Sequence, residues 1–206
     1  MKYAAVKRAY DVISPAYDLL FDRIFHAGRV AAVSLMGIAP GQWVLEVGIG
    51  TGLNLPLYPR HCHLVGIDLS RQMLRKAQGK VEELGLANVT LLMMDATRLT
   101  FADDAFDHVL ATYVISAVPD PVQVLREARR VCRPGGTIVM LNHFKSENPV
   151  LGAFEELVAP LTTKLGLFKP DLALTPLLEQ AGLIPDQVQR VNALNGWRLV
   201  RCINRE

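Results

Sequence analysis

Three glycines separated by single residues follow a short apolar run early in the chain. The run is Val44-Leu45-Glu46-Val47, and the glycines are Gly48, Gly50 and Gly52. Because glycine has no Cβ atom, such a loop lets the backbone approach a bound ligand closely. A dinucleotide-binding loop needs its third glycine one position later, where this chain has Leu53, and no Gly-Lys-Ser/Thr of a phosphate loop follows. The spacing therefore favours a ligand without a pyrophosphate.

Acidic side chains stand where two further apolar runs end. Asp68 closes the run that follows the glycines, at a position where a carboxylate accepts both hydroxyls of a ribose. Asp95 closes the next run, where we expect it to accept a hydrogen bond from an adenine amino group while Met93 and Met94 pack nearby. Glu46, just before the glycines, adds negative charge. The three acids predict a site for adenosine that carries positive charge.

These residues need a scaffold that brings strand ends together, and the pattern after residue 40 provides one. Short apolar runs alternate with helix-period segments, which predicts an α/β fold with a mostly parallel sheet and helices on both faces. Ser70 suits the N-cap of the first helix and Gly85 its C-cap, and Pro134-Gly135-Gly136 predicts a tight turn before the fifth strand. We expect strands near 43–47, 63–68, 89–94, 107–112 and 136–142, and helices near 70–84 and 121–132.

The last thirty or so residues predict a different ending to the sheet. A short helix opens at Thr175-Pro176 and closes at Gly182, and two strand-like runs near 187–193 and 197–203 are joined by Asn195-Gly196, a strong hairpin signal. We therefore expect an antiparallel hairpin to close a sheet that is otherwise parallel. The 206 residues fit one domain. Within it we expect a ligand-binding core over 41–145, a C-terminal helix end and hairpin over 177–206, and helical lids over 1–40 and 146–176.

The motifs resemble those of the class I S-adenosylmethionine-dependent methyltransferases, which implies a Rossmann-like fold, S-adenosylmethionine as the methyl donor, S-adenosylhomocysteine as its product and no metal. The resemblance rests on Leu45-Glu46-Val47-Gly48-x-Gly50-x-Gly52, Gly66-Ile67-Asp68-Leu69-Ser70 with Met73-Leu74, Asp95-Ala96 and Arg133-Pro134-Gly135-Gly136. It implies that the loop holds the methionine part, Asp68 the ribose, and Thr112 and Tyr113 the methyl group. The implied cofactor-binding residues are Glu46, Gly48, Gly50, Gly52, Asn54, Asp68, Leu69, Ser70, Met73, Asp95, Ala96, Thr112 and Tyr113.

The amino-terminal stretch predicts an amphipathic lid. Apolar and tyrosine residues recur at spacings of three and four, and Ser14-Pro15 suits the start of a second helix. Because basic residues lie beside this stripe, we expect residues 1–28 to rest on an anionic membrane surface. A helix packed on the core is the alternative, and the tyrosines could also point inward and hold an ammonium group. The stripe is Tyr3, Val6, Tyr10, Ile13, Tyr17, Leu20 and Ile24, and the basic residues are Lys2, Lys7 and Arg8.

Three side chains are candidates for moving a proton from an attacking amine. His143 ends the fifth strand, where a neutral imidazole could take that proton or bind a substrate phosphate, and a structural histidine is the alternative. Tyr10 and Tyr17 are the other candidates. The apolar 146–176 segment is surrounded by Lys145, Lys164 and Lys169, which suits acyl chains and a phosphate as well as it suits a buried helix.

The amino end adds a narrower resemblance. Val6-Lys7-Arg8-Ala9-Tyr10-Asp11, Pro15-Ala16-Tyr17-Asp18 and the run 48–58 resemble the bacterial phospholipid N-methyltransferases, which convert phosphatidylethanolamine to phosphatidylcholine. This implies a phospholipid substrate. Methyltransferases that act on carbon in ubiquinone and menaquinone precursors share a similar Tyr-Asp opening, and they remain the main alternative beside small-molecule N-methyltransferases.

Composition limits the partners. A net charge of +2 is too small for a protein whose main role is to hold nucleic acid. Three widely spaced cysteines predict neither a disulfide framework nor a zinc knuckle, and His61-Cys62-His63 lacks further metal ligands nearby. No signal peptide or membrane-spanning run is evident. We therefore expect a cytoplasmic protein, peripheral on the inner face of the membrane, without an obligate protein partner.

Overall fold

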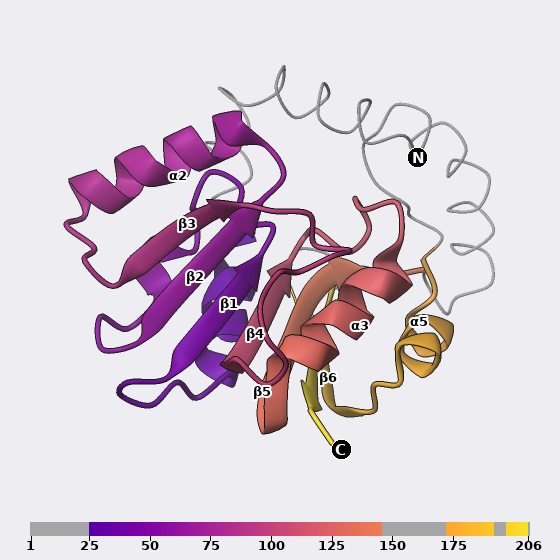
Figure 1. The fold of residues 1–206 in the computed structure, drawn as a ribbon. Helices are drawn as coiled ribbons and strands as arrows, with labels where there is room; N and C mark the ends of the chain where they lie inside the picture. The colour runs from indigo at the N-terminus through magenta and orange to yellow at the C-terminus, as the bar shows by residue number, and fades with distance from the viewer. Residues whose placement is uncertain (1–24, 146–171, 192–196, 206) are drawn as a thin grey trace.

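In the computed structural model, a twisted seven-stranded sheet is flanked by helices (Figure 1). The structure describes residues 25–145, 172–191 and 197–205. A helical segment over 25–35 precedes the first strand. The elements that follow are β1 (Trp43–Val47), the 3-10 turn η1 (Leu55–Leu57), β2 (His63–Asp68), α2 (Arg71–Glu83), β3 (Val89–Met93), β4 (Phe106–Thr112), α3 (Pro121–Val131), β5 (Cys132–His143), α5 (Leu174–Ala181), β6 (Pro185–Val191) and β7 (Trp197–Ile203).

The strand order, β3-β2-β1-β4-β5-β7-β6, places the ligand site. The first five strands run parallel, and β7 is antiparallel to both β5 and β6. The order reverses between β1 and β4, and open α/β sheets bind ligands at such a switch point, beyond the carboxyl ends of the strands. The glycine loop follows β1, so it lies at this point.

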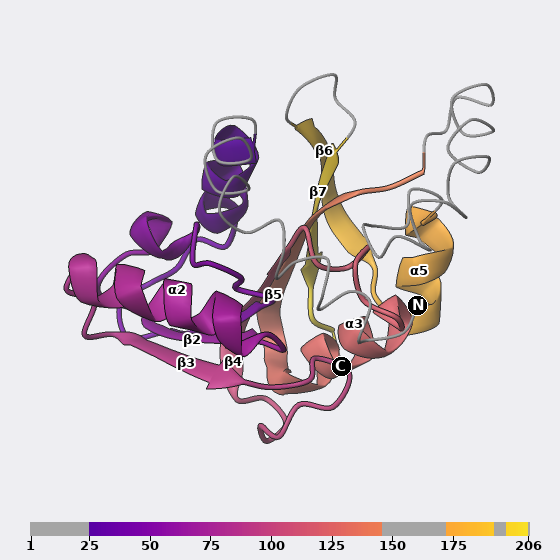
Figure 2. The same ribbon diagram turned by 90° about the horizontal axis from the view of Figure 1, so that it is seen from above.

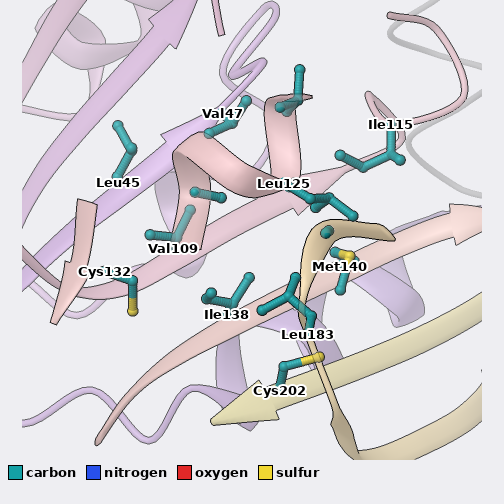
Figure 3. Close-up of a cluster of buried hydrophobic side chains, with 14 of the residues drawn as sticks. Leu45, Val47, Val109, Ile115, Leu125, Cys132, Ile138, Met140, Leu183 and Cys202 are labelled. Carbon is teal, nitrogen blue, oxygen red and sulfur yellow. The ribbon is translucent and has the colours of Figure 1, made fainter. Parts of the chain in front are cut away.

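The sheet has an apolar layer on each face because neighbouring residues of a strand point to opposite sides. On one face Leu45, Val109 and Met140 pack with residues of α3 and α5 (Figure 3). On the other face Val44 and Leu110 pack with residues of α2 and of the 25–35 segment. Figure 2 shows these two helical elements on the opposite side from α3 and α5. The described part of the predicted 1–40 lid is therefore largely a helix of the core.

The predicted α/β fold is confirmed, with corrections at element ends. Ser70 is the N-cap of α2, and its Oγ accepts a hydrogen bond from Met73 N at 3.4 Å. Gly85 follows the C-cap residue Leu84 and adopts a φ of 59°. The predicted turn at 134–136 is wrong, because these residues belong to β5, whose register with β4 shifts there.

The helix and the two strands that end the sheet have the predicted types, but the bounds of two of them differ from the prediction. α5 begins at Leu174, just before the predicted Thr175-Pro176, and Gly182 is its left-handed C-cap. β6 spans Pro185–Val191 in place of 187–193, while β7 has the predicted bounds. The two strands pair antiparallel, as the hairpin signal indicated, although Asn195-Gly196 lies outside the described residues.

Candidate functional site

The glycine loop is held against the core at its two ends and is open in its middle. All three glycines have φ values between 57° and 78°, a region that side chains disfavour. A Cβ atom at Gly48 would lie 2.5 Å from Val114 Cγ2, and one at Gly52 would lie 2.5 Å from Leu55 Cδ1. A Cβ atom at Gly50 would approach no atom of the described residues, other than its chain neighbours, more closely than 4.0 Å. The space beside Gly50 is therefore available to a ligand.

Asp68 links the end of β2 to this loop. One carboxylate oxygen, Oδ2, accepts a hydrogen bond from Gly50 N at 3.0 Å, and Oδ1 accepts one from Ser70 N at 2.8 Å. Burial raises the pKa of Asp68 above its usual value, against the lowering effect of these backbone donors. A carboxylate has about four acceptor sites, more than the backbone donors of Ser70, Gly50 and Leu69 occupy, so Asp68 retains capacity for a ribose hydroxyl. The predicted role of Asp68 therefore fits the geometry.

A buried polar network lies at the end of β1. Glu46 is 1% exposed, and its Oε1 accepts a hydrogen bond from Asn54 Nδ2 at 2.7 Å. Its Oε2 accepts one from Tyr58 OH at 2.8 Å. Asn54 Nδ2 also donates to Thr112 Oγ1 at 3.0 Å, which joins β1, the loop and β4. Three predicted site residues, from three separate segments, are thus bonded directly to one another.

The charge state of Glu46 follows from this burial. Desolvation raises its pKa to about 7, although the hydrogen bonds from Tyr58 and Asn54 and the nearby Arg29 charge lower it. Asp68 raises it slightly further by repulsion. Glu46 is therefore only partly ionised at neutral pH without a ligand. A cation bound nearby would favour the negatively charged form that was predicted at this position.

Asn54 offers an acceptor to a ligand. Both of its amide hydrogens have a protein partner, but Oδ1 is buried and accepts no hydrogen bond from the part of the chain that the structure describes. A buried acceptor without a donor is costly, and a ligand ammonium group would supply the donor. This is the group that the methionine part of the predicted methyl donor carries.

Apolar side chains lie uncovered where β2 and β3 end. Leu69 is 40% exposed and Met93 is 57% exposed, although both are large and apolar. Asp95 follows β3, and its Oδ1 accepts hydrogen bonds from Thr97 N and Oγ1, both at 2.8 Å. An adenine ring would bury the two apolar side chains and offer its amino group to an acid. This matches the predicted adenine position.

Three other predicted adenine neighbours also pack within the protein. Ser70 is 6% exposed and caps α2, and Met73 in the first turn of that helix is 5% exposed. Ala96 packs partly buried against the core. All three follow the ends of β2 or β3, as predicted, while the first two also hold the helix in place.

Tyr113 belongs to a group of aromatic residues beside the loop. It follows β4 with a φ of 58°, a strained backbone conformation that is common at functional sites. The Phe25 ring lies 4.9 Å from the Tyr113 ring and 4.9 Å from the Trp197 ring, measured between centroids. The His143 ring lies edge-on to Trp197 at 5.9 Å. We call Phe25, Tyr113, His143 and Trp197 the aromatic group; it joins the predicted methyl-site residue to the predicted proton acceptor.

Sequence reasoning missed several of these residues, and two of its candidates fall outside the described part of the chain. Tyr10 and Tyr17 lie outside the described residues. Tyr58 was part of a recognised run but received no role, although its hydroxyl contacts Glu46. Trp197 is the antiparallel partner of His143, and the hairpin signal, which concerns β6 and β7 alone, does not indicate this pairing. Nothing in the sequence indicated that Phe25 would meet Tyr113.

The donors and acceptors together fit S-adenosylmethionine. The loop leaves space at Gly50, and Asn54 Oδ1 is available to an ammonium group. Asp68 has capacity for a ribose, and Leu69 and Met93 expose apolar surface that an adenine ring would cover. When bound, this compound supplies an electrophilic methyl group on a sulfonium ion. No group of three or more His, Cys, Asp or Glu side chains suited to a metal occurs among the described residues.

Comparison with known proteins gives the family. Residues 45–140 match the methyltransferase domain family. The chain is 42% identical over 167 residues to the phosphatidylethanolamine N-methyltransferase of Cereibacter sphaeroides, covering 81% of each protein. It is 32% identical over 176 residues to the demethylmenaquinone methyltransferase of Listeria welshimeri, covering 79% of this chain and 74% of that one.

A solved structure supports the fold. The phosphoethanolamine N-methyltransferase 2 of Haemonchus contortus, in complex with S-adenosyl-L-methionine, superposes with a TM-score of 0.75 at 17% identity. The match covers 96% of this chain and 60% of that one. The fold, the site and the relatives agree: the chain belongs to the class I S-adenosylmethionine-dependent methyltransferases.

Proposed function

We propose that the protein is a phospholipid N-methyltransferase that methylates phosphatidylethanolamine and its mono- and dimethyl forms towards phosphatidylcholine. The observation that carries this proposal is the 42% identity to a phosphatidylethanolamine N-methyltransferase over 81% of both chains. The quinone methyltransferases are 32% identical over a similar share of the chain. The greater identity therefore favours the phospholipid substrate.

Methyl transfer requires the protein to align the two reactants more than to activate either of them. Methyl transfer is an in-line displacement, so the protein must hold the amine nitrogen against the sulfonium methyl and keep water out. The amine must also lose a proton before its lone pair can attack. We assign this proton to His143, the only imidazole of the aromatic group, with Tyr10 and Tyr17 as further candidates from the sequence. The rings of the aromatic group suit an amine that becomes a quaternary ammonium ion.

We also propose that the protein acts while resting on a membrane. Among the described residues, no helix has both the length and the apolar character needed to cross a bilayer. The proposed contact lies in residues 1–28, whose sequence combines an apolar stripe with basic residues beside it. A lipid substrate and a surface helix would place the amine headgroup beside the carboxyl edge of the sheet.

The deciding experiment gives the pure protein labelled S-adenosylmethionine and a choice of acceptors. We expect label in the mono-, di- and trimethylated lipids when vesicles contain phosphatidylethanolamine, and none when they contain only phosphatidylcholine. Demethylmenaquinone in the same vesicles tests the second candidate function, which rests on the 32% identity to the menaquinone enzyme. Transfer to the quinone without transfer to lipid would overturn the phospholipid assignment.

A further inference from the structure

Tyr58 lies in the apolar core, yet its hydroxyl makes a polar contact that does not contribute to apolar packing. Its side chain is 6% exposed and packs among apolar residues of the face that carries α2. Its hydroxyl nevertheless donates to Glu46 Oε2 at 2.8 Å. A phenylalanine would fill the same space without requiring a buried partner. The hydroxyl therefore has a purpose other than packing.

Glu46 needs two donors to keep one orientation. Asn54 Nδ2 holds Oε1 and Tyr58 OH holds Oε2, so the carboxyl plane is fixed at both oxygens. The same Asn54 amide presents a buried Oδ1 that accepts no hydrogen bond from the described residues. Because Asn54 lies two residues beyond Gly52, this acceptor lies beside the open loop. A cation bound there would meet Asn54 Oδ1 with the Glu46 charge directly behind it.

We propose that Tyr58 is a positioning residue for the methyl donor: its hydroxyl holds Glu46 behind Asn54 so that this acid ionises as the cationic cofactor binds. Cofactor binding then releases a proton from Glu46 to solvent. The proposal concerns the donor site alone and goes beyond the proposed function, because it does not depend on which acceptor is methylated.

The charged neighbours of Glu46 set the pH range. Burial raises its pKa to about 7, while Tyr58, Asn54 and Arg29 lower it and Asp68 raises it. Below this pH the cofactor must displace a proton, so its affinity rises as the pH approaches 7. Loss of the Tyr58 hydroxyl removes a contact that favours the carboxylate, which raises the pKa of Glu46 further. The pH range over which the affinity rises therefore moves upward.

The test is calorimetric titration of S-adenosylmethionine between pH 5.5 and pH 7, where the α-amino group of the cofactor stays charged, in buffers that differ in ionisation enthalpy. For the wild-type protein we expect a proton to be released near pH 6 and less release as the pH rises to 7. Tyr58→Phe should weaken binding about tenfold at pH 7, the loss expected for one hydrogen bond to a charged group, and shift the profile to higher pH. Glu46→Gln should release no proton and show a flat profile.

Thr137→Val is the matched control, since it removes a buried hydroxyl at the amino-terminal end of the β4–β5 pair, away from the loop. It should keep the wild-type profile. Identical profiles for the wild-type protein and Tyr58→Phe would overturn the proposal. So would the absence of proton release by the wild-type protein, a result that holds even if Tyr58→Phe does not fold.

Discussion

Glu46 links the chemistry of the site to the stability of the fold. Its pKa is about 7 in the folded protein and 4.5 in the absence of burial, so the folded state holds this proton more tightly than the unfolded chain. The stability associated with this group is complete below pH 4.5 and is lost as the pH rises to about 7. From the difference in pKa, the loss amounts to about 3 kcal/mol.

We therefore expect Glu46→Gln to gain stability relative to the ligand-free wild-type protein as the pH rises from 5 to 7.5. Urea unfolding at both pH values measures the free energies, and Glu82→Gln, on the exposed side of α2, serves as the control because it also removes a carboxylate. The double difference for Glu46 should be about 2 kcal/mol, since part of the full effect is already lost at pH 5. Parallel pH profiles for Glu46→Gln and the wild-type protein would contradict a raised pKa at this residue.

Gly50 and Gly85 allow a backbone effect to be separated from a ligand effect. Their φ values are 57° and 59°, and within the described segments a Cβ atom at either position has no neighbour closer than 4.0 Å. Alanine at either position should lower the free energy of unfolding by a similar amount, roughly 1 to 2 kcal/mol, because the left-handed conformation is unfavourable for a residue with a Cβ atom. Only Gly50→Ala should also weaken S-adenosylmethionine binding, by about tenfold or more, because its methyl group enters the ligand space. Calorimetric affinities together with unfolding free energies test both parts. Equal cofactor affinities in the two variants would show that the ligand does not approach Gly50.

Residue types and local spacing predicted some of the site residues but not the others. Gly48, Gly50, Asp68 and Asn54 lie within a few residues of strand ends, so their placement follows once the strands are identified. The contact between Phe25 and Tyr113 joins residues 88 positions apart, from a helix on one face and a strand end. No local pattern reports such a contact, because the orientation of a helix on a sheet is decided by packing.

The helical segment over 25–35 connects the core to the site. Ala32 and Val33 pack on the sheet, while Phe25 in its first described turn contacts two rings of the aromatic group. Phe25→Leu keeps apolar volume and loses two aromatic contacts, worth about 1 kcal/mol each. We expect a loss of about 2 kcal/mol in stability, faster hydrogen exchange over 25–35 and a several-fold lower rate of methyl transfer.

Phe101 provides the control for this element. Its ring lies 5.0 Å from Phe106, where β4 begins, at the end of the sheet away from the loop. Phe101→Leu should cost about 1 kcal/mol and leave methyl transfer and exchange over 25–35 unchanged. If both variants slow methyl transfer equally, the contact of Phe25 has only a structural role.

Element types were predictable because strands and helices here differ clearly in period. The β1 and β7 bounds agree with the prediction, and Ser70 and Asp120 cap their helices with side-chain oxygens. The error at 134–136 has a physical reason: Pro-Gly-Gly is typical of turns, yet the pairing of β4 with β5 continues past a bulge there. The partner strand, which local sequence does not contain, decides this outcome.

At the scale of the molecule, the donor site and the proposed acceptor side lie on the same edge of the sheet but are built from different parts of the chain. The donor site consists of strand ends and a loop fixed by the core, which is why family motifs identify it. The proposed acceptor side includes the 25–35 segment, His143 and Trp197, which come from the chain on either side of the motif-bearing strands. Two relatives that match this chain are named for different acceptors, a phosphatidylethanolamine and a demethylmenaquinone.

A membrane surface is the proposed partner of the whole molecule. Binding to anionic vesicles tests this proposal. The formal net charge is only +2, so attraction to anionic lipid must come from a local group of basic residues. We expect that deleting residues 1–13, or changing Lys2, Lys7 and Arg8 to glutamate, lowers the fraction of protein that sediments with anionic vesicles. Each basic residue near such a surface contributes about 1 kcal/mol, so the charge reversal should reduce binding at least tenfold.

The control changes three exposed arginines of the core, Arg71, Arg75 and Arg98, to glutamate, which alters the net charge by the same amount. If the amino end carries the contact, this variant sediments nearly as the wild-type protein does, and raising the salt concentration weakens wild-type binding. Unchanged affinity for S-adenosylmethionine shows that each variant is folded. Equal losses in both charge variants would mean that net charge, and not a surface helix, brings the protein to lipid, and the amino end would then have to be assigned to core packing.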